Sequence, residues 1–184
     1  LNVGTVYVTL SALSWDPVDY TWKANHDFGL VREHLFVADL TKSQAQGGPY
    51  RFVSEAHLPA DAIRGELAQE WWWETPNQLI VKLRDGVRWH EKPGVMKSRE
   101  VTAEDVVYTF NIINQSPKKS VANYYDYIDS IEAPDAKTLI FNTNEYNAEW
   151  QYRFGYGYQS SIVPVEFANV DPKDWRQMVG TGPF

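Results

Sequence analysis

The chain has 184 residues, of which 43% are hydrophobic and 22% are charged, and its formal net charge is −7. This composition is typical of a globular chain with one good-sized domain, or a domain with a subdomain, and it excludes a largely disordered protein. Because the charge is negative and the densest basic spot is only Lys118-Lys119, nucleic acid is excluded as a partner.

The sequence shows neither a membrane-spanning segment nor a cysteine. Its longest unbroken apolar run is Leu35–Ala38, whereas a spanning helix needs about 20 largely apolar residues. The lack of cysteine excludes disulfides and thiolate metal sites and says nothing about the compartment. No export-signal pattern stands at Leu1, so a signal peptide is not present in this chain.

The N-terminal part is predicted to form a strand, a loop and a helix. Alternating β-branched residues in Gly4–Leu10 indicate the strand. After the break at Asp16-Pro17, apolar residues in Asp27–Ala38 are spaced as in a helix. From Thr41 to Arg64 this periodicity is lost, which predicts a long surface excursion and a subdomain boundary near Asp39.

A hairpin is predicted in the middle of the chain. The runs Trp71–Trp73 and Leu79–Leu83 flank Glu74–Gln78, which contains a Pro-Asn pair with turn chemistry. Three residues of the second strand should face the core: Leu79, Val81 and Leu83. The turn signal Asp85-Gly86 then leads into Val87–Trp89, which should continue the sheet as a short strand.

A helix is predicted to begin at Ala103. The preceding Thr102 and the acid Asp105 have capping-box spacing, which satisfies free backbone N–H groups at a helix start. The apolar residues that follow recur at spacings of four and three, which indicates one buried stripe: Val106, Phe110 and Ile113. Pro117 lies just beyond the expected end of this helix.

A second hairpin is predicted from Ser130–Ala133 and Thr138–Asn142, which flank the turn Pro134–Lys137. Two residues of its second strand, Leu139 and Phe141, should share one face. Helices mixed with hairpins, without internal repeats, indicate an α/β or α+β layered domain.

The stretch around residue 150 has two interpretations. Aromatic residues alternate strictly, as on one face of a strand: Tyr152, Phe154, Tyr156 and Tyr158. However, Asn147–Trp150 resembles a helix start and Gly155 could cap a helix end. We therefore favour a helix as far as Phe154.

The ordered motifs of the chain resemble those of the family 5 extracellular solute-binding proteins of ABC importers, which include oligopeptide-, dipeptide-, nickel-, sugar- and opine-binding members. The matching segments, in chain order, are Trp15-Asp16-Pro17, Arg32–Leu35, Leu67–Trp71, Leu83–Trp89, Thr102–Val106, Ile162-Val163-Pro164 and Gly180–Phe184. His34 departs from the family's Tyr-Glu-Gly-Leu motif, in which a glycine holds its place. His90-Glu91 likewise replaces an Asp-Gly pair.

The resemblance implies an α/β fold, the first lobe of a class II periplasmic-binding-protein-like fold with an inserted α+β subdomain. It assigns residues 1–37 and 161–184 to the first lobe and residues 38–160 to the inserted subdomain. Full chains of the family are longer, so Phe184 is expected to be a truncation point and the second lobe to lie outside this chain.

The resemblance also implies candidate ligand-binding residues. The segment after the Asp-Pro pair lines the cleft in peptide-binding relatives, and an aromatic wall follows the capped helix. These positions correspond to Tyr20, Thr21, Trp22, Lys23, Tyr124 and Tyr125. The competing interpretation is a connecting loop for the first four and core packing for the tyrosines. Core packing is also favoured over a sugar-binding platform for Trp71–Trp73.

The implied function is the solute-binding component of an ABC transporter. It would act as a monomer in the periplasm, or outside the cytoplasmic membrane and associated with it. There it would deliver oligopeptides or peptide-like solutes to the membrane subunits of an importer.

Enzymatic activity, cofactors and metals are not expected, since no catalytic motif appears and the histidines lack metal-ligand spacing: His26, His34, His57 and His90. One alternative is a carbohydrate-active hydrolase or carbohydrate-binding module, based on 15% aromatic residues and 24 acids. Another is a sugar- or opine-binding member of the same family.

Overall fold

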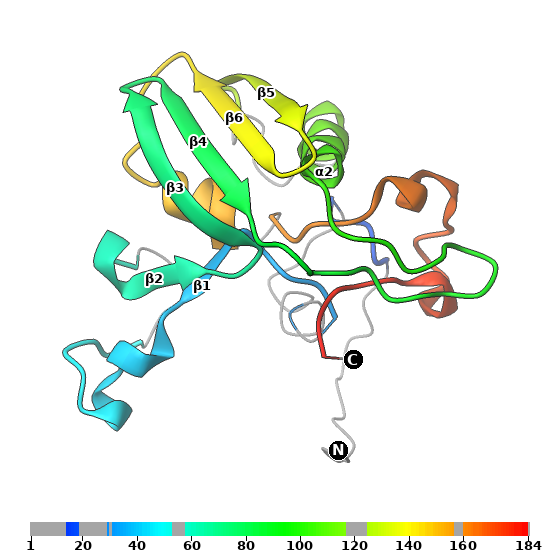
Figure 1. Cartoon of the computed structure of the whole chain (residues 1–184), viewed down its shortest axis with the longest axis horizontal. Coiled ribbons are helices and arrows are strands. Elements are labelled where there is room, and N and C mark those ends of the chain that lie inside the picture. The colour runs from blue at the N-terminus through cyan, green and yellow to red at the C-terminus, as the bar shows by residue number, and fades with distance from the viewer. Residues whose placement is uncertain are drawn as a thin grey trace.

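The computed structural model describes residues 14–18, 29, 31–52, 58–116, 125–156 and 160–183. Its central element is a four-stranded antiparallel sheet in the order β3-β4-β6-β5, with helix α2 packed against one face (Figure 1). The elements are β3 (Ala68–Thr75), β4 (Gln78–Leu83), α2 (Ala103–Gln115), β5 (Ile128–Asp135) and β6 (Thr138–Thr143). A separate two-stranded ribbon pairs β1 (Phe36–Ala38) with β2 (Ile63–Gly65). The strand predicted at Gly4–Leu10 lies outside the described residues.

Both predicted hairpins are confirmed. The pairs β3–β4 and β5–β6 are antiparallel, and β4 joins β6 so that Leu79 faces Phe141 and Val81 faces Leu139. These four side chains are 0% exposed, as the alternation of the sequence predicted. Strand β5 runs through Pro134, which an edge strand tolerates because its outer N–H positions need no partner.

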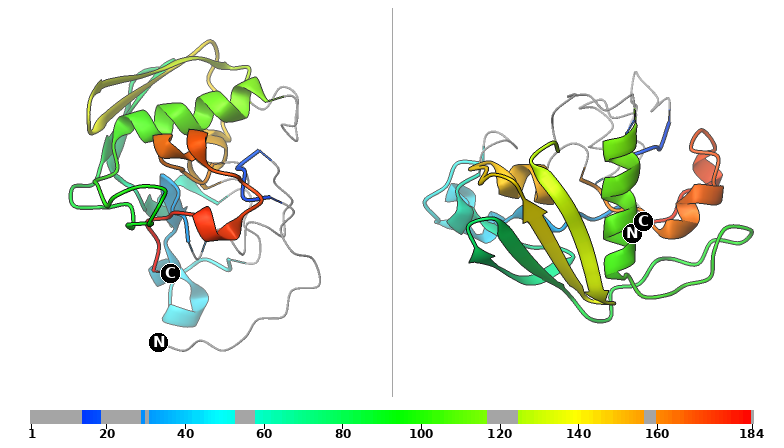
Figure 2. Two further views of the ribbon diagram at one scale, coloured as in Figure 1. Left: turned by 90° about the vertical axis from the view of Figure 1, so that its right-hand side faces the viewer. Right: turned by 90° about the horizontal axis from the view of Figure 1, so that it is seen from above.

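Helix α2 covers the inner face of the sheet, which Figure 2 shows from the side. It begins at Ala103 as predicted, and the carboxylate of Asp105 accepts a hydrogen bond from the backbone N–H of Thr102 at 3.0 Å. Its apolar stripe is buried, with Val106, Phe110 and Ile113 at most 2% exposed. Burying a side chain of this size contributes about 1.5–3 kcal/mol.

The predicted helix Asp27–Ala38 is wrong over its described second half, where the chain forms strand β1. Leu35 and Phe36 are consecutive and both 0% exposed, so the chain buries two opposite faces rather than one helical stripe. The carbonyls of His34 and Leu35 accept hydrogen bonds from Leu67 and Ala68 at 2.9 and 3.0 Å. Pairing with a distant segment therefore overrides the local apolar spacing.

The predicted continuation of the sheet at Val87–Trp89 is also wrong, although Gly86 adopts the left-handed conformation of the predicted turn at φ 75°. The only ladder contact here is an isolated bridge between Arg88 and Glu100. The reason lies in Trp89, which is 0% exposed and whose indole reaches under the start of α2. The segment thus crosses to the helix instead of extending the sheet.

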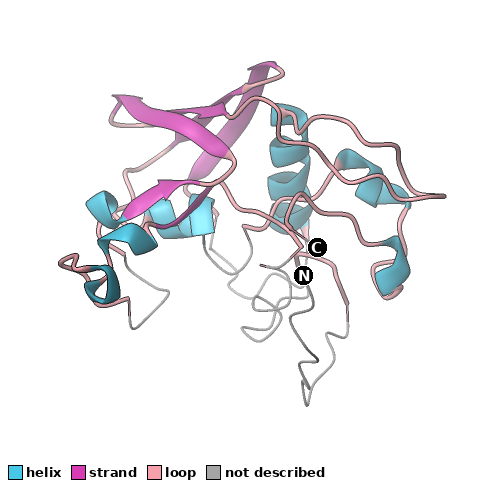
Figure 3. Ribbon diagram, turned by 60° about the horizontal axis from the view of Figure 1, so that its bottom comes forward, coloured by secondary structure: helices cyan, strands magenta, loops and turns pink. Residues whose placement is uncertain are grey.

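Outside the sheet and α2, loops and short helical turns make up most of the described chain, as Figure 3 shows. The turns are Leu40–Lys42, Gln44–Gln46, Ala60–Ala62, Gln151–Tyr156, Val165–Asn169 and Trp175–Gln177. The helical stretch expected near residue 150 is confirmed, but it continues through Gly155 to Tyr156 rather than ending there. No helix within the described ranges combines the length and apolar character that crossing a bilayer requires. The boundaries near residues 37 and 160 stay predictions.

Candidate functional site

Five of the six predicted ligand-binding residues lie outside the described part of the chain: Tyr20, Thr21, Trp22, Lys23 and Tyr124. The sixth, Tyr125, is 1% exposed and packs edge-on against Phe110 with ring centroids 5.3 Å apart. Its hydroxyl donates a hydrogen bond to the carbonyl of Arg153 at 3.3 Å. Tyr125 therefore serves the core in this structure, and ligand contact by its ring stays a prediction.

The tryptophan run behaves as the core interpretation predicted. Trp71 lies 4.6 Å from Phe36 and Trp73 lies 5.7 Å from Trp150, measured between ring centroids. Trp72 points the other way and is 40% exposed. Two of the three rings thus pack inward from alternate positions of β3, and no flat stacking surface is formed by the run.

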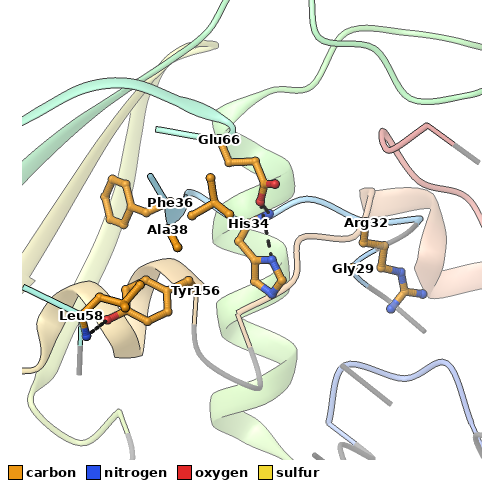
Figure 4. Close-up of a pocket in the computed structure, with 9 residues that line it drawn as sticks. Gly29, Arg32, His34, Phe36, Ala38, Leu58, Glu66 and Tyr156 are labelled. Atoms are coloured by element: carbon orange, nitrogen blue, oxygen red, sulfur yellow. Dashed lines mark hydrogen bonds and ion pairs between the residues drawn. The ribbon is translucent and has the colours of Figure 1, made fainter. Parts of the chain in front are cut away.

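A pocket beside β1, which we call the β1 pocket, lies among the described residues. Its volume is about 220 Å³. Apolar groups form most of the wall, and three polar side chains stand at one end (Figure 4). The wall consists of Phe36, Val37, Ala38, Leu58 and Tyr156, and the polar end of Arg32, His34 and Glu66. A concave apolar surface with a few polar groups is the usual form of a small-molecule site.

His34 and Glu66 form the central polar pair of the β1 pocket. The carboxylate of Glu66 accepts a hydrogen bond from the backbone N–H of His34 at 2.6 Å. It lies 3.6 Å from Nδ1 of the His34 ring. His34 is 9% exposed, and its other ring nitrogen, Nε2, is buried and has no hydrogen-bond partner among the described residues. Buried polar atoms are nearly always paired in proteins, so Nε2 is an exception that needs a reason.

Arg32 occupies the end of the β1 pocket away from Tyr156 (Figure 4). Arg32 is 1% exposed, and its guanidinium donates a hydrogen bond to the carbonyl of Trp15 at 2.7 Å and stands over the ring of Phe167. Burial lowers the pKa of Arg32 to about 9, and the negative charge of Asp16 opposes this shift. The side chain stays cationic at neutral pH and joins the first described segment to the C-terminal turns.

Tyr156 forms the opposite end of the β1 pocket, and its hydroxyl accepts a hydrogen bond from the backbone N–H of Leu58 at 3.0 Å. Next to it, Gly155 lies against Phe36 so closely that a Cβ would overlap the ring. The absence of a side chain at residue 155 therefore allows the Gln151–Tyr156 turn to close on β1.

Gly155→Ala is expected to lower the free energy of unfolding by about 1–3 kcal/mol, because the added methyl group must displace the buried ring of Phe36. Urea denaturation of the full-length protein measures the change. In a Phe36→Leu background the same substitution should cost less, since a smaller side chain leaves room. An equal cost in both backgrounds would contradict the overlap as the cause.

A second polar cluster, centred on Asp105, holds distant parts of the fold together. Its carboxylate is 0% exposed and accepts hydrogen bonds from Trp89 at 3.0 Å, from Arg99 at 2.7 and 2.9 Å, and from the backbone of Val165 at 3.0 Å. Arg99 also binds Glu166. The cluster joins the start of α2 to two distant loops and leaves no free acceptor for a ligand.

The β1 pocket was not predicted from the sequence, in which His34 stood out only as a departure from the family motif and as a histidine without metal-ligand spacing. A signal was nonetheless present, because His34 stands where the family motif has glycine, and a bulky ring in that place must enter a neighbouring space. Among the described residues, no group of three or more acidic or histidine side chains is arranged to hold a metal ion.

The fold is that of the periplasmic-binding-protein class, as the similar structures given below show. Residues 62–184 match the sequence model described as "Bacterial extracellular solute-binding proteins, family 5 Middle". The chain belongs to this family.

Three similar proteins illustrate the relationship. The dipeptide-binding protein of Escherichia coli K12 is 21% identical over 168 residues, covering 82% of this chain and 31% of the relative. The structure of MoaA from A. tumefaciens R10 with mannopinic acid has a TM-score of 0.71 at 22% identity, covering 94% of this chain and 32% of that one. DppA from Helicobacter pylori with the peptide STSA gives 0.67 at 23% identity, covering 93% and 34%. This chain thus spans about a third of the length of these relatives, and the structural likeness establishes the fold.

Proposed function

We propose that this chain is part of a solute-binding protein that captures oligopeptides or peptide-like solutes outside the cytoplasmic membrane and delivers them to an ABC importer. The observation that carries the proposal is the family match over residues 62–184. Proteins of this architecture enclose a ligand between two lobes, and closure of the lobes, without bond chemistry, produces the form that a transporter recognises.

The proposed protein works in the periplasm or at the outer side of the membrane, as a monomer, with the membrane subunits of the importer as its partners. Its ligand contacts include the segment Tyr20–Lys23. The names of the relatives support a binding role over the hydrolase alternative, since the curated relative is a dipeptide-binding protein. Opines are a second candidate class of solute, favoured by the similarity to the mannopinic acid complex of MoaA.

Native mass spectrometry of the full-length protein is the test of the solute class. We expect a series of bound masses that fragment as short peptides, because a peptide receptor binds mainly backbone groups and accepts varied side chains. A single bound opine would assign the narrower role. Hydrolysis of glycans by the purified protein would contradict the proposal.

Trp22→Ala is expected to weaken binding of the copurified solute about tenfold or more, as loss of a buried aromatic contact does in other interfaces. The melting temperature should remain nearly unchanged if the ring serves the ligand. Calorimetric titration and thermal denaturation of the same variant measure both quantities. A large loss of stability with unaltered affinity would place Trp22 in the core instead.

A further inference from the structure

The four-stranded sheet β3-β4-β6-β5 has an outer face that no described helix or strand covers. Alternate residues of a strand point to opposite faces of a sheet. The residues on the inner face are buried on the side of α2, where Phe141 meets the ring of Phe110. In the left view of Figure 2, α2 lies on that side of the sheet and no described helix or strand lies on the other. The outer face is therefore a surface of the part of the chain that the structure describes.

An apolar row crosses the middle of this outer face. The strand register places Trp72 beside Ile80 and Ile80 beside Ile140, on three neighbouring strands. Trp72 is 40% exposed and Ile140 is half-buried, whereas Ile80 between them is 8% exposed. The indole N–H of Trp72 donates a hydrogen bond to the carboxylate of Glu74 at 2.9 Å. An occupant of the outer face would thus contact mainly Trp72, a residue type that often dominates protein interfaces, and Ile140.

Acidic side chains surround the apolar row. Two lie on β3 near Trp72, and one lies on β5 beside Ile140. They are Glu70, Glu74 and Glu132, and all three are exposed. Lys82 is the one basic residue among the paired positions of the outer face, and its ammonium group binds the hydroxyl of Thr138. This excess of negative charge favours a cationic partner and disfavours a second copy of the chain, whose net charge is −7.

We propose that the outer face of the sheet is an interaction surface for a partner protein with a basic segment. An apolar side chain of that segment packs on Trp72 and Ile140, and flanking lysine or arginine side chains bind the surrounding carboxylates. Neighbouring strands are about 4.8 Å apart, so the glutamates of β3 and β5 are separated by roughly 14 Å. In an extended segment, two residues four positions apart span about the same distance. Binding to this face is measured without a transport assay, so the result does not depend on the proposed transported solute.

The test uses the peptide acetyl-Lys-Ser-Leu-Ser-Lys-amide, in which both lysines and the leucine share one side when the chain is extended. NMR titration of the full-length protein measures its affinity. We expect signal changes in β3, β4, β5 and β6, and an affinity that falls about threefold or more when NaCl rises from about 20 mM to about 300 mM. The same peptide with serine in place of leucine should bind about threefold or more weakly, because it loses the apolar contact. Equal affinities of the leucine and serine peptides would overturn the proposal.

Two variants and two matched controls locate the surface. Trp72→Ala should weaken binding of the leucine peptide about fivefold or more, and Glu132→Gln should weaken it about two- to fivefold. The controls are Trp175→Ala, which removes a ring that is 61% exposed in the last helical turn, and Glu91→Gln, which removes an exposed charge outside the sheet. Both controls should bind as the unaltered protein does.

Two outcomes would overturn the assignment of this surface. One is an equal loss of affinity in Trp72→Ala and Trp175→Ala, which would show that the peptide follows the overall negative charge of the protein. The other is a set of signal changes in the four strands on addition of maltohexaose but not of the peptide, which would assign the face to a glycan. If Trp72→Ala fails to fold, Glu132→Gln and the comparison of the two peptides still decide the result.

Discussion

Asp105→Asn is expected to lower the free energy of unfolding by about 3–5 kcal/mol, because it breaks a buried, charge-assisted network. The carboxylate of Asp105 is 0% exposed and receives N–H donors from Trp89, Arg99, Thr102 and Val165. An asparagine has one acceptor oxygen and places an NH₂ group against these donors. At least one buried donor then loses its partner, and Arg99 keeps only Glu166 as a counter-ion.

Urea denaturation of the full-length protein at neutral pH measures this loss. The matched control is Asp129→Asn, which makes the same chemical change at an exposed position of β5 and should alter stability by less than about 0.5 kcal/mol. Equal losses in the two variants would show that the Asp105 network does not contribute specifically.

The pH dependence of stability tests the same network independently. Burial raises the pKa of Asp105, but hydrogen bonds from Arg99, from the backbone of Thr102 and from Trp89 outweigh it, so the pKa lies below the ordinary aspartate value. A group with a depressed folded pKa contributes stability above its unfolded pKa of about 4 and loses it as pH falls through the folded value. The difference in melting temperature between the protein and Asp105→Asn should therefore shrink below about pH 4. A constant difference from pH 7 to pH 2 would contradict this account.

The most regular parts of the fold were predictable because their sequence signals are local. The segments Leu83–Trp89 and Thr102–Val106 were recognised as family motifs, and the structure brings them together at the hydrogen bond from Trp89 to Asp105. The hairpins were predictable because strand alternation and turn chemistry are local properties. The start of α2 was predictable because its cap lies within four consecutive residues.

The β1 region was not predictable from local pattern because its structure depends on distant partners. Strand β1 forms because it pairs with Ile63–Gly65, and the N–H groups of Leu67 and Ala68 bind the carbonyls of His34 and Leu35 just before it. The β1 pocket combines His34, Glu66 and Tyr156, which are separated by 32 and 90 positions along the chain. A hollow between such segments is a property of packing, and no sequence window contains it.

Phe141→Ala is expected to lower the free energy of unfolding by about 3–5 kcal/mol, the usual cost of removing a fully buried phenylalanine ring. Phe141 is 0% exposed and lies where three parts of the fold meet. Its ring stacks on Phe154 with centroids 4.7 Å apart and meets the edge of Phe110 at 5.7 Å. The substitution therefore leaves a cavity between β6, α2 and the Gln151–Tyr156 turn, and its neighbours cannot close the cavity without moving one of these elements.

The neighbouring residue supplies the control for this prediction. Ile140 is half-buried on the opposite face of β6, so Ile140→Ala should cost only about 1 kcal/mol in the same urea experiment. A double-mutant cycle between Phe141→Ala and Phe110→Ala should show a coupling of about 0.5–1.5 kcal/mol, because the two rings are in contact. Strict additivity of the two losses would mean that the rings contribute only through burial. A smaller loss for Phe141→Ala than for Ile140→Ala would show that the sheet packs on α2 through its other face.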